Sequence, residues 1–255
     1  MSFDACARLV ERGDPLRFRA AMAVPVAARR VLFPLYAFNL EVARAPWVTQ
    51  EAMIAEMRLQ WWRDVLEEIA QGGPVRSHEV TDALAQVLDA QGARDLDALV
   101  EVRRWDIYKD AFADRDHLDR YIAGTSGALM GTAARLLGPC DADVVADFAW
   151  GSGVANFLRA IPALENAGRR PLIDGTVEGV RELAHDALAR LDRARGNRKA
   201  VSRAAGAALV AGWQVLPVLR RAIADPQAVA LGALEPAPFS DRLRLARAAM
   251  LGWWV

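Results

Sequence analysis

Acidic side chains that could hold a metal ion recur at a regular spacing in the middle of the chain. Asp106, Asp110 and Asp114 stand four residues apart, so on a single helix their carboxylates would share one face. Carboxylate oxygens suit a hard cation such as Mg²⁺, but a metal normally takes ligands from a second element as well. No such partner is identifiable, so a solvated acidic stripe is the favoured interpretation and a displaced metal site is the alternative.

Arginines are the second group that could do chemistry, because a guanidinium binds phosphate oxygens through two parallel hydrogen bonds. The candidates for a diphosphate clamp are Arg29, Arg159, Arg169 and Arg170. The same side chains could instead pair with Glu41, with Glu165 or with helix C-termini. All but two of the 32 basic residues are arginines, which is typical of a GC-rich bacterial genome. Pairing within the protein is therefore favoured over a clamp.

The histidines and cysteines predict no catalytic group. His78, His117 and His185 are scattered and have no neighbouring nucleophile or metal-ligand spacing. Cys6 and Cys140 form no CxxC motif, and two cysteines favour a reducing cytosol over a disulfide framework. Basic and acidic residues number 32 each, so net charge gives no reason to expect a nucleic-acid partner.

The elements that would position these groups are helices. Ala, Leu, Arg and Glu dominate the chain, and apolar β-branched runs that would predict strands are absent. The predicted helices span 26–41 (kinked at Pro34), 51–70 (capped by Thr49), 77–92 (capped by Ser77), 95–112, 116–137, 141–161, 176–195, 198–224 and 240–255. No long loop or repeat divides the chain, so we expect a single all-α domain over residues 1–255.

The sequence predicts a soluble protein, or one attached only peripherally to a membrane. The first residues carry charges throughout and lack the apolar core of a signal peptide, and no stretch approaches the length of an uncharged membrane span. Two adjacent tryptophan pairs, at positions 61–62 and 253–254, should each send one ring inward. An outward ring beside Arg63 or Arg247 could mark a partner or membrane interface.

Three local sequences together resemble the squalene/phytoene synthase family. They are Arg29 with Leu35-Tyr36-Ala37-Phe38, then Tyr121-Ile122-Ala123-Gly124-Thr125-Ser126-Gly127, then Asn156-Phe157-Leu158-Arg159 with Gly168-Arg169-Arg170. Asp106, fifteen residues before Tyr121, matches a recurrent acid of the family. The resemblance covers residues 18–172 and implies an isoprenoid synthase (terpenoid synthase) type bundle around a central cavity. It further implies that this cavity is lined by Arg29, Tyr36, Asp106, Tyr121, Gly127, Asn156 and Arg159.

The carboxylates that the family uses for catalysis are missing from this sequence. The resemblance implies two Asp-rich motifs that hold Mg²⁺ against the departing diphosphate. The first set of acids would fall on Ala43, Arg44 and Trp47, where Arg44 would also place a positive charge. The second set would fall on Ala160 and Leu164. We therefore expect no catalytic residue, no metal ligand and no cofactor.

One non-catalytic branch of the family, the respiratory complex I assembly factors, matches better than the enzymes do. The matching stretches are 37–43 (AFNLEVA), 57–62 (MRLQWW) and 158–162 (LRAIP). This resemblance implies a bacterial, cytoplasmic protein, peripheral to the inner membrane, that binds a protein of a membrane-associated complex. Two alternatives stay open: a prenyl transferase that condenses prenyl diphosphates with Mg²⁺, and a carrier that binds an isoprenoid or lipid.

Overall fold

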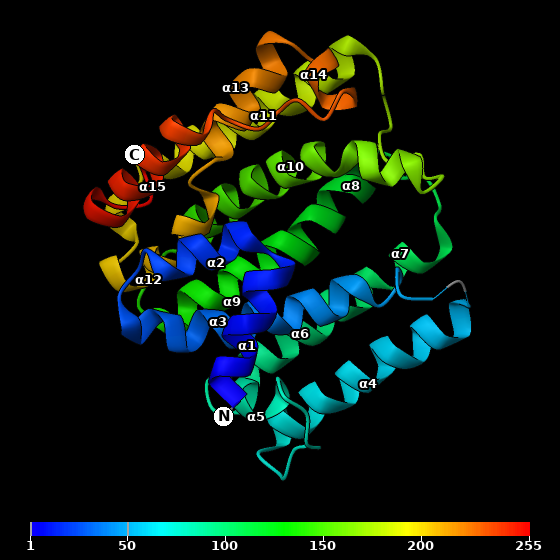
Figure 1. Cartoon of the computed structure of the whole chain (residues 1–255), viewed down its shortest axis with the longest axis vertical. Helices are drawn as coiled ribbons and strands as arrows, with labels where there is room; N and C mark the ends of the chain where they lie inside the picture. The colour runs from blue at the N-terminus through cyan, green and yellow to red at the C-terminus, as the bar shows by residue number, and fades with distance from the viewer. Residues whose placement is uncertain (1, 50) are drawn as a thin grey trace.

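The computed structural model describes residues 2–49 and 51–255, and helices build this part of the chain (Figure 1). The helices are α1 (Ser2–Gly13), α2 (Pro15–Met22), α3 (Val26–Arg44), α4 (Ala52–Gln71), α5 (Thr81–Ala85), α6 (Ala90–Arg103), α7 (Trp105–Tyr108), α8 (Arg115–Ile122), the π-helical η1 (Ala123–Gly127), α9 (Ala128–Leu137), α10 (Ala142–Asn166), α11 (Val177–Gly196), the 3₁₀ turn η2 (Arg198–Ala200), α12 (Arg203–Leu209), the 3₁₀ turn η3 (Val210–Gly212), α13 (Val215–Ala224), α14 (Gln227–Ala230) and α15 (Pro238–Leu251). Within the described residues, strand-like pairing is limited to an isolated bridge between Cys140 and Val201. The predicted all-α class is confirmed.

Two of the longest helices, α10 and α11, begin where the sequence predicts, each directly after a residue whose side chain caps it. Asp141 accepts hydrogen bonds from the backbone N–H of Val144 at 3.1 Å, and α10 starts at the next residue. Thr176 accepts one from the N–H of Gly179 at 3.1 Å and caps α11 in the same way. These side chains satisfy N–H groups that the first helical turn leaves without partners. The predicted starts of both helices are therefore confirmed.

Other boundaries differ from the prediction. Thr49 does not cap α4, because Glu51 occupies the N-cap position and the Thr49 hydroxyl accepts from the N–H of Glu51 at 3.1 Å. Ser77 does not cap a long helix. A short α5 forms instead, and Asp89 caps α6 by accepting from the N–H of Gly92 at 2.7 Å. The predicted helix at 198–224 is divided into η2, α12, η3 and α13, and the predicted helix at 116–137 contains the π-turn η1. At the start of the chain, α1 and α2 form in a region for which no helix was predicted. Pro34 lies inside α3, which continues past it to Arg44.

Helix α10 runs through the middle of the bundle, between α11 and the α8–η1–α9 segment (Figure 1). Glycines permit this close approach. A Cβ on Gly151 would lie 2.9 Å from the carbonyl oxygen of Ala187 in α11. A Cβ on Gly153 would lie 2.6 Å from Ile122 on the other side. Helix α10 is thereby held against both neighbours, and its inward residues reach the space between η1 and α13.

One segment, Arg203–Ala224, is long and apolar enough to cross a membrane by length and composition. It contains α12, η3 and α13, and 61% of its most apolar window is buried inside the molecule. Burial of this kind is typical of core helices, so the segment packs as part of the bundle.

Candidate functional site

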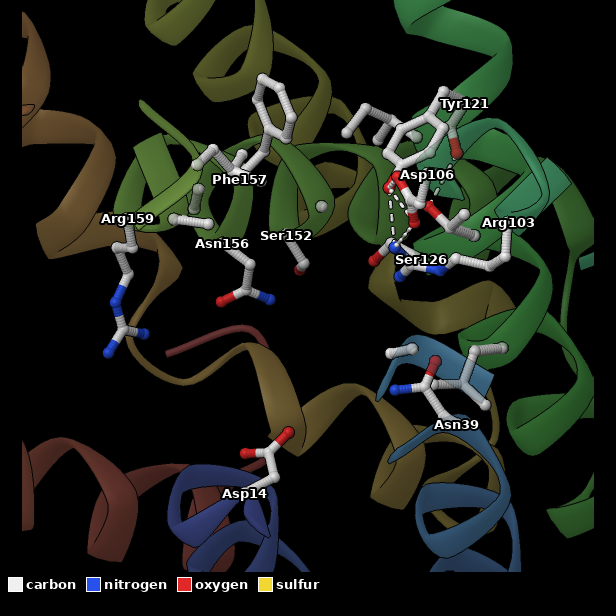
Figure 2. Close-up of a pocket in the computed structure, with 18 of the residues that line it drawn as sticks. Asp14, Asn39, Arg103, Asp106, Tyr121, Ser126, Ser152, Asn156, Phe157 and Arg159 are labelled. Carbon is white, nitrogen blue, oxygen red and sulfur yellow. Dashed lines mark hydrogen bonds and ion pairs between the residues drawn. The ribbon is translucent and has the colours of Figure 1, made fainter. Parts of the chain in front are cut away.

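A cavity of about 600 Å³ opens in the bundle (Figure 2). Its lining comes from α2, α3, α6, α7, α8, η1, α9, α10, α12, η3, α13 and the loops between them. Five of the residues that the sequence predicts there line it: Tyr36, Asp106, Tyr121, Asn156 and Arg159. Figure 2 shows Asn156 and Arg159 on one wall and the Asp106–Tyr121 pair on another. The structure therefore brings together residues that lie up to 123 positions apart in the sequence, from Tyr36 to Arg159.

Arg29 and Gly127 do not line the cavity. The guanidinium of Arg29 donates to the carbonyl oxygens of Val24 at 3.0 Å and Met22 at 2.9 Å. It therefore satisfies carbonyls at the end of α2, as an arginine near a helix C-terminus commonly does. Gly127 closes the π-turn η1, and its neighbour Ser126 supplies the lining side chain instead.

Asp106 is the centre of a buried polar cluster on the cavity wall. Its carboxylate accepts a hydrogen bond from the hydroxyl of Tyr121 at 2.9 Å and one from Arg103 at 3.0 Å. Arg103 also donates to the Tyr121 oxygen at 2.7 Å. From the other side, Arg169 donates to the carbonyl oxygen of Asp106, and its guanidinium lies 3.8 Å from the carboxylate. Two arginines thus neutralise one buried carboxylate.

The pKa values of this cluster fix its protonation. Burial raises the pKa of the Tyr121 hydroxyl well above its usual range, and the neighbouring Asp106 charge raises it further. Burial lowers the pKa of Arg103, but the adjacent Tyr121 and Asp106 outweigh burial, and the pKa of Arg103 is raised overall. At neutral pH, Tyr121 is therefore a hydrogen-bond donor and Arg103 is a cation, as their contacts require.

A second chain of polar contacts begins at Arg159, Gln214 and Glu235 in the cavity lining. Arg159 donates to the carboxylate of Glu235 and, at 3.1 Å, to the side-chain oxygen of Gln214. The amide of Gln214 in turn donates to Asp241 at 2.5 Å, and Asp241 pairs with Arg19 at 3.3 Å. The sequence offered no signal for Gln214 or Glu235, because both follow the segment that the family resemblance covers.

Asp14, Arg17 and Tyr36 form a third polar group in the lining. Asp14 caps α2 and forms an ion pair with Arg17 at 2.7 Å, while the Arg17 guanidinium lies 5.6 Å from the Tyr36 ring centroid. Burial raises the pKa of Tyr36 to about 12 despite the opposing effect of Arg17. Tyr36 therefore stays neutral and is not a general base near neutral pH.

The positions where the family resemblance implies metal-binding acids face the cavity but carry no acids. Ala43 and Trp47 line the cavity from α3 and the turn that follows it, and Ala160 and Leu164 line it from α10. Arg44 differs from the expectation, because it is exposed outside the lining, with its guanidinium against Gly13. The expected positive charge at a metal position is therefore absent from the cavity wall.

The remaining carboxylates do not fit a magnesium ion. The acids in the lining are Asp14, Asp106, Asp110 and Glu235. The first two and Glu235 are each held by an arginine, so they are not free to share a cation. Within the described residues, no group of three or more histidine, cysteine, aspartate or glutamate side chains is placed to hold a metal ion. The donor set therefore lacks the cluster of oxygen ligands that Mg²⁺ requires.

The predicted acidic stripe of Asp106, Asp110 and Asp114 does not form. Helix α7 ends at Tyr108, and Lys109 takes a left-handed conformation with φ of 59°. Asp110 therefore lies in an exposed loop, and Asp114 caps α8 by accepting from the N–H of His117 at 2.7 Å. The three carboxylates share no helix face.

A family model described as squalene/phytoene synthase matches residues 10–173. The chain is 31% identical over 175 residues to a Drosophila melanogaster protein named NADH dehydrogenase (ubiquinone) complex I, assembly factor 6 homolog, which covers 65% of this chain and 51% of that protein. It is 26% identical over 172 residues to the Homo sapiens protein named assembly factor 6 of the same complex, over 62% and 48% of the two chains. The chain thus spans about half the length of the curated relatives it matches.

The fold is also similar to solved structures. A crystal structure of a dehydrosqualene synthase in complex with ligand has a TM-score of 0.79 at 15% identity and covers 96% of this chain and 94% of its own. The crystal structure of squalene synthase HpnC from Alicyclobacillus acidocaldarius has a TM-score of 0.72 at 18% identity, over 87% and 92% of the two chains. At these identities the likeness shows that the helical architecture is shared.

Proposed function

Because this chain belongs to the squalene/phytoene synthase family, we propose that it is a non-catalytic member that helps to assemble a membrane-associated respiratory complex. In this proposal the protein binds a protein component of that complex, in a bacterial cytoplasm at the surface of the inner membrane. It does not condense prenyl diphosphates and requires no cofactor.

The observation that carries the proposal is the chemistry of four cavity positions. Ala43, Trp47, Ala160 and Leu164 face the space where the family resemblance implies two acidic motifs. Departure of a diphosphate develops a large negative charge, which a bound Mg²⁺ would stabilise. Alanine, leucine and tryptophan offer no oxygen to such an ion, and the neighbouring Asp106 is neutralised by two arginines. The cavity therefore lacks the groups that would hold the metal.

The choice of a respiratory complex is supported by the relatives. Both curated relatives named above are assembly factors of complex I, and each aligns with 62–65% of this chain. Each alignment, however, takes in only about half of the relative's own length. We therefore propose, from these partial alignments, that this chain shares the role in complex I assembly.

A deletion strain tests the proposal directly. We expect the strain to lose NADH:quinone oxidoreductase activity and assembled complex I while its squalene and carotenoid content stays normal. Expression of the wild-type chain should restore the activity. A strain that keeps complex I but loses an isoprenoid hydrocarbon would overturn the proposal in favour of the transferase alternative.

Magnesium dependence separates the two hypotheses in the purified protein. A transferase should bind a prenyl diphosphate more tightly when Mg²⁺ is present, because the ion bridges carboxylates and phosphate oxygens. For this chain we expect the affinity for farnesyl diphosphate to be the same in a buffer with Mg²⁺ as in a buffer with a chelator, whether that affinity is measurable or negligible. Isothermal titration in the two buffers makes this comparison.

A second candidate function, a carrier of an isoprenoid or lipid, is favoured by the cavity itself. Its volume of about 600 Å³ is within the range of small-molecule sites, and apolar side chains such as Leu40, Phe112 and Phe157 form much of its wall. Mass spectrometry of an organic extract should then detect a bound apolar molecule. The variant Ala211→Trp, which fills the cavity from η3, should lower the recovered amount. Equal recovery from this variant would exclude the cavity as the binding site.

A further inference from the structure

The C-terminal helix α15 carries an apolar stripe that no described part of the chain covers. Phe239, Leu243 and Met250 are 81%, 53% and 68% exposed. Their spacing of four and seven residues places them on one side of the helix, and the exposed Ala246 lies between them. Figure 1 shows α15 at the outer edge of the molecule. Exposed apolar side chains aligned in this way mark an interaction surface.

On α15 itself, exposed arginines flank the stripe and no acid of the helix is exposed. Arg242 and Arg247 are exposed on α15, on either side of the apolar residues. The helix contains one acid, Asp241, which is buried and bound to Gln214 and Arg19. The solvent-facing surface of α15 is therefore apolar and cationic.

A basin of about 650 Å³ adjoins this helix and is rich in arginine. Its lining contains the five arginines Arg195, Arg198, Arg220, Arg244 and Arg247, together with Trp213, Trp254 and Val255, and no aspartate or glutamate side chain. Arg195 is held by the carbonyl oxygen of Trp254 at 2.7 Å and by Asp192 at 3.3 Å. Within the described residues, Arg198, Arg220 and Arg247 have no carboxylate at ion-pair distance.

The basin and the cavity lie on opposite sides of α13. Val215 and Val218 face the cavity, whereas Leu216 and Arg220 face the basin, and the two linings share no residue. A ligand in the basin would therefore leave the cavity open. The basin is therefore a separate site from the cavity.

We propose that α15 and the arginine basin form a docking surface for a bilayer that contains anionic phospholipids. The apolar stripe lies at the boundary between headgroups and acyl chains, as in other amphipathic interfacial helices. The unpaired guanidiniums bind lipid phosphates, for which their planar geometry is suited. Trp254, over which the Arg198 guanidinium lies at 5.7 Å, sits at the edge of the basin, where interfacial tryptophans are common.

The combination of features selects a bilayer over other polyanions. A nucleic acid or a free phosphate would use the arginines, but it would leave Phe239, Leu243 and Met250 in water. A membrane surface satisfies both the charge and the apolar stripe on the same helix. This inference is independent of whether the cavity is catalytic, so each can fail without the other.

Vesicle co-sedimentation tests the docking surface with the full chain. We expect binding to phosphatidylcholine vesicles that contain phosphatidylglycerol, little binding to pure phosphatidylcholine, and weaker binding at high salt. Neutralising two unpaired basin arginines, Arg220→Gln with Arg247→Gln, should lower the partition coefficient about fivefold per arginine. The pair Phe239→Ser with Leu243→Ser should also lower it, because the stripe no longer inserts.

Matched variants on other faces serve as controls. Arg8→Gln with Arg12→Gln removes two exposed arginines from α1, and Met53→Ser with Met57→Ser removes two exposed apolar residues from α4. Both pairs should bind as the wild type does, and circular dichroism should show that every variant remains folded. Absence of binding to anionic vesicles, equal binding to neutral ones, or equal losses in the control pairs would overturn the proposal.

Discussion

The guanidinium of Arg169 lies over the ring of Trp47, with its carbon 4.7 Å from the ring centroid. Trp47 occupies a position where the family resemblance implies an acid, and Arg169 belongs to the basic turn after the second motif position. The same arginine also reaches Asp106. Arg169, a candidate diphosphate ligand in the sequence, is therefore held by contacts with Trp47 and Asp106 of the same chain.

Replacing Trp47 should weaken the fold modestly. In Trp47→Ala the Arg169 guanidinium loses its aromatic partner, and a cation–π contact at a partly exposed site contributes about 1 kcal/mol. Urea unfolding should show a decrease of this order in the free energy of unfolding. The neighbouring variant Val48→Ala, which removes another exposed apolar side chain, should change it less. Equal effects of the two variants would contradict a specific contact.

Asp106 should be the most sensitive polar residue of the cavity wall. In Asp106→Asn, Arg103 and Arg169 would keep buried positive charges without a counter-ion. Removing one partner of a buried ion pair typically costs about 3–5 kcal/mol. Thermal and urea unfolding measure the loss, and the exposed Asp110→Asn is the matched control.

The Tyr121 hydroxyl contributes to the same cluster, and its effect should be smaller. Tyr121→Phe removes a neutral donor to Asp106 and should cost about 1–2 kcal/mol. Combining it with Asp106→Asn should give less than the sum of the two losses, because both changes weaken the same charge-assisted hydrogen bond. Strict additivity in this double-mutant cycle would show that the two side chains are not coupled.

The helical architecture and the family were predictable because their signals are local. Asp141 and Thr176 mark the starts of α10 and α11, because each caps its helix through hydrogen bonds made within the first turn. The family pattern likewise rests on short segments, and the match over residues 10–173 confirms it. Trp62 and Trp253 are the buried members of their pairs, so the prediction of one inward ring in each pair is also confirmed.

The features that were missed depend on single backbone conformations or on distant contacts. The left-handed conformation of Lys109 ends α7 and breaks the acidic stripe, although nothing in the residue type predicts it. Arg29 caps α2, a helix that was itself not predicted. Arg159 meets Glu235, 76 residues later in the chain, and no spacing rule relates the two.

Alkaline solution should destabilise the protein through its buried tyrosines. Burial raises the pKa of Tyr36 to about 12 from the value of 10.0 for an unperturbed tyrosine. The folded state therefore holds this proton more tightly than the unfolded chain does. The stabilisation is complete below about pH 10 and is lost as the pH rises towards 12. Urea unfolding across this range should show the decrease, and Tyr36→Phe should make it shallower.

Acid should weaken the start of α6 through Asp89. The hydrogen bonds from Arg135 hold the pKa of this carboxyl at about 2, below the usual 3.8. Its contribution is therefore present above pH 3.8 and is lost as the pH falls towards 2. Asp89→Asn keeps a good capping side chain but removes the charge, so its stability should depend less on pH in this window. The exposed Asp4→Asn on α1 should keep the wild-type profile.

The central claim is that a cavity without acids at Ala43, Trp47, Ala160 and Leu164 does not catalyse the condensation of prenyl diphosphates. A product assay tests this claim most directly. The pure protein is incubated with farnesyl or geranylgeranyl diphosphate and Mg²⁺, and the organic extract is analysed for condensed hydrocarbons and their cyclopropyl intermediates. We predict that the substrate is recovered and that no C30 or C40 product forms. Sustained, Mg²⁺-dependent turnover to such a product would contradict the account.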